Sequence, residues 1–227
     1  SQKWVDYVSA FWHVDYVCSM RLSTFTERYR KWCHRHGYNF QSDKPRMLWE
    51  KAKDLIAMLP MDKMTKSLVQ TAVAQLNVLS KTVETLRTQM IELAEKLPEY
   101  PVVIAMNGVG ATLASQLIAE IGDITRFPRR GSLTAFAGVD PGAKQSGTMQ
   151  RNKTSKAGSP HLRRALFQIV SGLLMRAPDD PVYNFMAKKR SEGKPYYVYM
   201  TAGANKFLRI YYGRVNEYLA GLSQEQE

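Results

Sequence analysis

The chain has 227 residues, of which 44% are apolar, so it is long enough and apolar enough to fold around a sizeable core. Its 32 lysines and arginines against 20 acids give a net charge of +12, which favours a polyanionic partner. Two cysteines exclude a disulfide framework, and no apolar run reaches membrane-spanning length. The sequence shows no signal peptide, so we expect a cytoplasmic protein.

The positive charge is concentrated in one segment. Residues 126–194 hold 14 lysines and arginines against four acids, a surplus of ten. Such a concentration is typical of a nucleic-acid-binding surface. A membrane surface would attract the same charge, but the chain lacks a strongly amphipathic basic helix, so we expect no membrane partner. The chain begins SQKW without a methionine, and we expect a fragment of a longer protein.

Residues 1–60 are predicted to form N-terminal linker helices. Residues 1–40 are rich in aromatic side chains, whose spacing predicts one or two amphipathic helices that end near Gly37. A further helix is expected from a cap near Asp43 to about Leu59. The segment also contains His13, Cys18, Cys33, His34 and His36. Their spacing fits no recognised zinc finger, so we expect no metal site.

The clearest periodic signal lies in residues 61–98, which we expect to form a long helix of coiled-coil type. Apolar residues recur there in alternating steps of three and four, at Val69, Ala72, Leu76, Leu79, Val83, Leu86, Met90, Leu93 and Leu97. Two arrangements would bury this stripe. A second copy of the chain would make residues 69–97 a homo-oligomerisation helix, and the helix at 45–59 of the same chain would form an antiparallel hairpin with it.

Residues 99–227 are predicted to form a compact helical domain, which makes the chain mostly α-helical. Within it, residues 102–123 resemble a helix-hairpin-helix element, in which Gly108 and Gly110 permit a tight turn before a helix that starts at Ala111. The free N–H groups at the start of that helix would bind a DNA phosphate without reading the base sequence. A plain turn between two packed helices explains the same glycines.

A glycine-rich, hydroxyl-rich and strongly cationic loop follows, between Phe136 and Phe167. The predicted nucleic-acid-binding residues are Gly108, Gly110, Lys144, Arg151, Lys153, Ser155, Lys156, Arg163 and Arg164, and the residues predicted to shape the loop are Gly147 and Gly158. Backbone N–H groups, hydroxyls and cations around one volume suit a phosphate. A solvated basic loop is the alternative, with Ser155 or Lys156 as a simple cap of the next helix. We expect at most a short β-hairpin, around residues 138–154.

Three segments occur in the order NGVGATLASQLIAEIGDITRF, LTAFAGVDPGAKQSG and SKAGSPHLRRALF. Together with the heptad helix before them, they resemble the C-terminal transposase domain of insertion-sequence family one-ten, the Piv/MooV-like site-specific DNA recombinases. The resemblance covers roughly residues 63–219. It implies a protein of a bacterial or archaeal cytoplasm that is associated with the nucleoid.

The resemblance also implies a nucleophile and two partners. The family nucleophile is a serine just before a glycine in the loop after the FAG segment, which places the catalytic role on Ser146. The family acts on DNA, and it is understood to use a structured guide RNA from its own element to bring target and donor DNA together.

Full-length members of the family are understood to carry a RuvC-like domain with four metal-binding acids ahead of the coiled coil. This sequence contains no such acidic set, so we expect no cofactor in the chain itself and Mg²⁺ only through that further domain. The complete transposase is expected to be a DNA recombinase, and the chain alone to bind nucleic acid without recombining it. Two alternatives are a non-catalytic nucleic-acid-binding module and an oligomerisation module.

Overall fold

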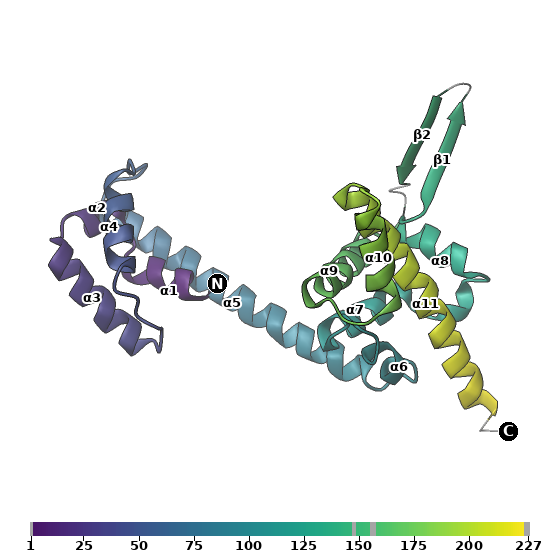
Figure 1. Cartoon of the computed structure of the whole chain (residues 1–227). Helices are drawn as coiled ribbons and strands as arrows, with labels where there is room; N and C mark the ends of the chain where they lie inside the picture. The colour runs from purple at the N-terminus through teal and green to yellow at the C-terminus, as the bar shows by residue number, and fades with distance from the viewer. Residues whose placement is uncertain (1, 147–148, 155–157, 225–227) are drawn as a thin grey trace. The chain divides into compact units, whose positions relative to one another are not determined.

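Figure 1 shows the computed structural model of the chain, which describes residues 2–146, 149–154 and 158–224. The described residues are mostly α-helical, as the sequence predicts. The chain divides into two units, Ser1–Glu84 and Thr85–Glu227, and the division falls within helix α5 (Lys63–Ala94). The 32 residues of α5 confirm the long helix that the heptad pattern predicts. In the part of the chain that the structure describes, none of the helices combines the length and the apolarity needed to cross a bilayer.

Ahead of α5, the first unit holds α1 (Gln2–Ala10), α2 (Val14–Cys18), α3 (Leu22–Arg35) and α4 (Lys44–Lys53). The aromatic side chains form its core: Phe25 is fully buried, and its ring meets that of Phe11 edge-on at a centroid distance of 5.3 Å. The prediction of one or two helices before Gly37 is wrong. A separate helix starts after His13, because its imidazole accepts the backbone N–H of Asp15 at 3.0 Å and acts as an N-cap.

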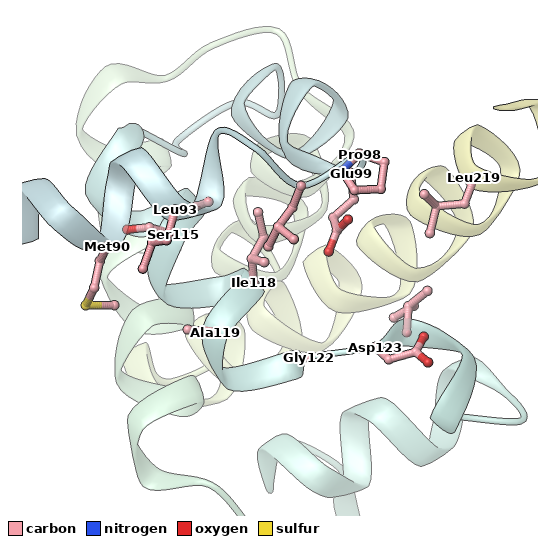
Figure 2. A pocket seen from close by; sticks show the side chains of 13 residues that line it. Met90, Leu93, Pro98, Glu99, Ser115, Ile118, Ala119, Gly122, Asp123 and Leu219 are labelled. Carbon is pink, nitrogen blue, oxygen red and sulfur yellow. The ribbon is translucent and has the colours of Figure 1, made fainter.

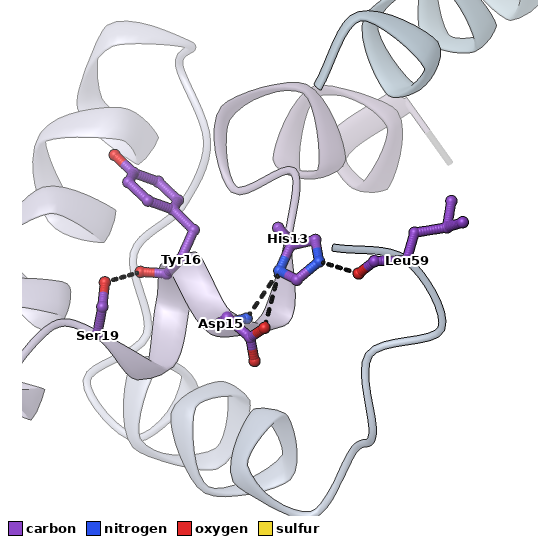
Figure 3. Close-up of polar contacts among 5 residues, drawn as sticks. All are labelled: His13, Asp15, Tyr16, Ser19 and Leu59. Carbon is purple, nitrogen blue, oxygen red and sulfur yellow. Dashed lines mark hydrogen bonds and ion pairs between the residues drawn. The ribbon is translucent and has the colours of Figure 1, made fainter. Parts of the chain in front are cut away.

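His13 also fixes the segment that leads into α5 (Figure 3). Since Nδ1 accepts a hydrogen bond from the Asp15 backbone, the neutral ring carries its proton on Nε2. This nitrogen donates to the backbone carbonyl of Leu59 at 2.9 Å. The side chain of His13 is therefore a structural link within the first unit.

Helix α4 ends at Lys53, so the prediction that it reaches Leu59 is wrong. Its last turn tightens, because the N–H groups of Asp54 and Leu55 donate to carbonyls only three residues back. A longer helix would gain little burial, since Ile56 is 93% exposed. Beyond α4, the segment is held at Leu59, whose backbone carbonyl accepts a hydrogen bond from His13.

The second unit is built around α9 (Pro160–Arg176), whose Leu166, Ile169 and Val170 are fully buried. The helices that pack against it are α7 (Ala111–Ile121), α8 (Arg130–Ala137), α10 (Pro181–Ser191) and α11 (Tyr196–Gln224). The short α6 (Tyr100–Ile104) and the 3-10 turn η1 (Ile124–Arg126) lie against α11. This is the compact helical region that the sequence predicts after the long helix.

A β-hairpin interrupts the helices between α8 and α9. Strand β1 (Pro141–Ser146) pairs antiparallel with β2 (Met149–Thr154), which agrees with the short hairpin allowed by the sequence. The register pairs Pro141 with Thr154 at one end and Ser146 with Met149 at the other. The hairpin is thus a local insertion in a helical unit.

Among the described residues of each unit, the apolar stripe of α5 is largely exposed. Leu79 is 62% exposed and Leu86 is 54% exposed, while α4 packs on α2 and α3. The interpretation of the stripe as half of an antiparallel hairpin with residues 45–59 is therefore wrong. Within the second unit, Met90 and Leu93 at the end of α5 line a cavity of about 580 Å³ (Figure 2). Its other walls come from the turn between α5 and α6, from α7, from the turn after α7 and from α11, and they are mostly apolar.

Candidate nucleic-acid interface

The hairpin brings four of the predicted site residues into one small element. Ser146 is the last residue of β1 and stands opposite Met149. Lys144, two positions before it, stands opposite Arg151, and Lys153 stands opposite Gly142. Three predicted phosphate-binding cations thus lie on the two strands that flank the predicted nucleophile. The predicted residues Gly147, Ser155 and Lys156 lie outside the described residues.

The segments on either side of the hairpin are tied together at its base. The backbone N–H of Ser159, just before α9, donates to the carbonyl of Phe136 in α8 at 2.8 Å. Gly158 has φ 129°, and a Cβ built at this position would collide with the same carbonyl. Arg163 adds a second tie, because its Nη1 donates to the carbonyl of Ala137 at 3.2 Å. This close approach gives a geometric reason for glycine at position 158.

Ser159 is the N-cap of α9. Its side-chain oxygen accepts the backbone N–H of Leu162 at 3.1 Å, and its hydroxyl donates to Glu120 of α7 at 2.8 Å. The interpretation of Ser155 or Lys156 as the cap of this helix is therefore wrong. Neither the cap at Ser159 nor its contact with Glu120 was predicted from the sequence, although a serine directly before a proline is an ordinary start signal for a helix.

A cavity of about 630 Å³ opens beside the base of the hairpin. It is lined by Gly138, Pro160, Arg163, Arg164, Phe167, Tyr197 and Thr201. Arg164 and Tyr197 are exposed, whereas Arg163 and Phe167 are half-buried. The sequence predicted the two arginines but missed Phe167, Tyr197 and Thr201. The run of tyrosines after Pro195 could have indicated this part of the site, because aromatic residues close to a basic segment are typical of nucleic-acid sites.

The turn that contains Gly108 and Gly110 lies on a different part of α9. Gly108 has φ 82°, and a Cβ there would lie 3.1 Å from the side chains of Ile169 and Leu173. These residues belong to the C-terminal half of α9, whereas the cavity lies at its N-terminal half. An acid also stands beside the turn, because the amide of Asn107 donates to the carboxylate of Asp180 at 3.0 Å. Packing accounts for Gly108, and Gly110 is the N-cap of α7.

Two charged groups near the base of the hairpin are already engaged. The carboxylate of Asp140 accepts from the amide of Asn205 in α11 at 2.8 Å. The guanidinium of Arg126 lies 4.7 Å from the ring centroid of Phe127 and 4.8 Å from that of Phe136. Arg126 therefore contributes to packing under α8, and the cations that line the cavity are Arg163 and Arg164.

Residues 101–185 match the family described as Transposase IS116/IS110/IS902. The match begins in α6 and ends in α10, so it includes the hairpin and the arginines of the cavity. The chain is also similar to the insertion element IS110 uncharacterized 43.6 kDa protein of Streptomyces coelicolor, with 33% identity over 110 residues. A second relative is the insertion element IS116 uncharacterized 44.8 kDa protein of Streptomyces clavuligerus, with 26% identity over 144 residues.

The two alignments cover 48% and 63% of this chain. They cover 27% and 36% of the relatives, so the matched part spans about a quarter to a third of the curated relatives' lengths. The matched residues 101–185 include all three segments that carry the predicted resemblance, which is thereby confirmed. Over residues 101–185, the chain is therefore similar to the IS116/IS110/IS902 family of transposases.

Proposed function

We propose that this chain is the DNA-binding and nucleophile-bearing portion of an insertion-sequence transposase. The observation that carries the proposal is the position of Ser146 at the end of β1, on a hairpin that holds Lys144, Arg151 and Lys153. The similarity of residues 101–185 to this transposase family supports a role in transposition. The clamped base of the hairpin supports a defined position for the serine-bearing strand relative to α8 and α9.

In the proposed reaction, the Ser146 hydroxyl oxygen attacks the phosphorus of a DNA phosphodiester. A bond forms between this oxygen and phosphorus, and the bond from phosphorus to one deoxyribose oxygen breaks. The proton lost by the serine balances the proton gained by the departing deoxyribose hydroxyl. Since a phosphodiester is exchanged for a phosphodiester, rejoining needs no external energy source. Nearby cations offset the negative charge that develops on the phosphorus oxygens.

Serine is a weak nucleophile at neutral pH and needs help to lose its proton. Among the described residues, no group of three or more His, Cys, Asp or Glu side chains is placed to hold a metal ion. The described residues thus do not fit a magnesium site, and no step on this chain is assigned to the metal. We propose that Mg²⁺ binds to an acidic domain elsewhere in the complete transposase, and that the chain alone binds nucleic acid without cleaving it.

Two further partners belong to the same proposal. A structured guide RNA is a second polyanion for the surplus of positive charge between residues 126 and 194. A second copy of the chain is the partner proposed for the exposed stripe of α5. Both would act at the nucleoid, where donor and target DNA lie.

Replacing the proposed nucleophile tests the reaction directly. In the complete transposase, Ser146→Ala should abolish the covalent protein–DNA adduct, which is detected as labelled DNA that remains on the protein in a denaturing gel. Affinity for DNA should stay within about twofold, because the serine adds little to phosphate binding. Ser191→Ala, which removes an exposed hydroxyl at the end of α10, is the matched control and should form the adduct normally. Adducts that persist in Ser146→Ala would rule out the proposal.

A second candidate function is favoured by a separate observation. The α5 stripe, with Leu79 and Leu86 more than half exposed, is suited to assembly whether or not Ser146 is a nucleophile. In that case the chain would act mainly as an oligomerisation module. A chain that remains monomeric at high concentration in a sedimentation measurement would exclude this function.

A further inference from the structure

The cavity at the base of the hairpin combines two chemical features that together suit a nucleotide. Arg163 and Arg164 supply guanidinium groups, which suit a phosphate. Phe167 and Tyr197 supply aromatic rings, which suit a flat base. Among the described residues that line the cavity there is no carboxylate to repel an anion. The volume of about 630 Å³ lies within the usual range of small-ligand sites.

The first ring is exposed but held in place. Tyr197 is 74% exposed at the start of α11, and its ring meets Tyr196 edge-on at a centroid distance of 5.3 Å. Tyr196 in turn meets Tyr199 edge-on at 5.5 Å, and Tyr199 is only 8% exposed. Tyr197 is thus connected through Tyr196 to the core. An exposed ring with a fixed support is suited to stacking, because little side-chain freedom is lost when a ligand binds.

The remaining groups of the cavity favour an anion. Arg163 is oriented by its hydrogen bond to the carbonyl of Ala137, and Arg164 beside it is exposed. Tyr197 is the second residue of α11, and the first turn of this helix contains no acidic side chain that would repel an anion from the positive end of the helix dipole. The hydroxyl of Thr201, one turn further along, adds a neutral donor and acceptor.

We propose that this cavity receives one unstacked nucleotide of a single-stranded stretch, with its base against Phe167 and Tyr197 and its phosphate on Arg164. The proposal rests on the proposed function, in that nucleic acid must bind this unit. It excludes an intact duplex as the occupant, because the faces of a paired base are covered by its neighbours in the stack.

The nucleotide in the cavity is not the one that Ser146 would attack. The cavity borders the residues just before β1, and Ser146 lies five residues further along the strand from Pro141. At about 3.3 Å per residue, the two positions are separated by roughly 17 Å of strand. The cavity therefore positions a strand at a distance from the reacting phosphate.

The test compares single-stranded with duplex binding by the 227-residue chain. Fluorescence anisotropy would be measured at one fixed salt concentration with labelled oligothymidine, oligouridine and an oligothymidine–oligoadenosine duplex. Tyr197→Ala should weaken binding of the single strands by about 5- to 150-fold, the range expected for loss of one stacked base, and should leave duplex binding unchanged. Tyr197→Phe keeps the ring and should bind all three as the unchanged chain does. The two single strands show whether DNA or RNA is the better source of the nucleotide.

Two controls separate stacking from charge and from folding. Tyr218→Ala removes a tyrosine from the other end of α11 and should change no affinity. Arg164→Ala should weaken single-strand binding more than Arg190→Ala, which removes an equal charge from α10 outside the cavity. If Tyr197→Ala binds single strands normally, the nucleotide pocket is wrong while nucleic-acid binding stands. If the unchanged chain binds none of the three ligands, both the pocket and the proposed function are wrong.

Discussion

At Gly158 the backbone passes so close to the carbonyl of Phe136 that a side chain has no room. The two groups are held together by the hydrogen bond from the neighbouring N–H of Ser159. The backbone conformation is a second constraint on this position, because φ at Gly158 is 129°, a region that residues with a Cβ rarely adopt. One glycine thus determines how the hairpin meets α8 and α9.

Gly158→Ala should therefore destabilise the second unit by about 2 kcal/mol or more, because it adds backbone strain and a steric clash. For a unit of this size, the melting temperature measured by circular dichroism should fall by about 4–8 °C. Gly131→Ala is the matched control, since Gly131 lies in α8 and a Cβ there meets nothing within 4 Å. That control should be neutral or slightly stabilising. Equal melting temperatures for the two variants would show that the approach at Gly158 is not a constraint.

At the level of single residues, the sequence predicted Arg163, Arg164 and Gly158 from composition and spacing. The cavity that joins Arg163 and Arg164 to Tyr197 could not be predicted from the sequence, because α11 approaches α9 only through tertiary packing. No local pattern encodes that approach. The role of Ser159 was within reach, since the signals for a helix start are local.

Among the elements, α5 is the one whose sequence pattern and surroundings disagree most. Its heptad repeat predicted both the helix and a buried stripe, and the helix is present while the stripe is exposed. Periodicity is a property of one chain, so it predicts an apolar face but not the partner that covers it. The helix expected to cover the stripe from within the chain is α4, which ends at Lys53 and packs on α2 and α3 instead.

The exposed stripe leads to a prediction about assembly. Sedimentation analysis of the chain should show a dimer or larger species that dissociates on dilution, and replacing Leu79 and Leu86 together by lysine should yield a monomer. These residues occupy successive d positions of the heptad, where a buried charge opposes pairing. Ala74→Lys, an exposed position on the opposite side of the heptad, adds charge without touching the stripe and should leave the assembly intact. A monomer before any substitution would contradict the prediction.

For the molecule as a whole, the surplus of ten positive charges between residues 126 and 194 matters more than any one contact. The structure divides these charges among separate elements. Lys144, Arg151 and Lys153 lie on the hairpin, Arg163 and Arg164 line the cavity, and Lys188, Lys189 and Arg190 lie at the end of α10. Net charge alone would attract DNA equally to all of them, whereas a defined interface uses the first two groups and not the third.

Salt dependence separates these two cases. Each phosphate neutralised by a lysine or arginine makes the slope of log affinity against log salt concentration more negative by about 0.9 on duplex DNA. Replacing Lys144, Arg151 and Lys153 together by alanine should therefore make the slope less negative by about 3. The matched variant replaces Lys188, Lys189 and Arg190 by alanine and removes the same charge from α10. Its slope should stay close to that of the unchanged chain, because counterions are released only where phosphates are contacted. Equal changes of this slope in the two variants would mean that overall charge holds the DNA, and that the hairpin cations contact phosphates no more than those of α10 do.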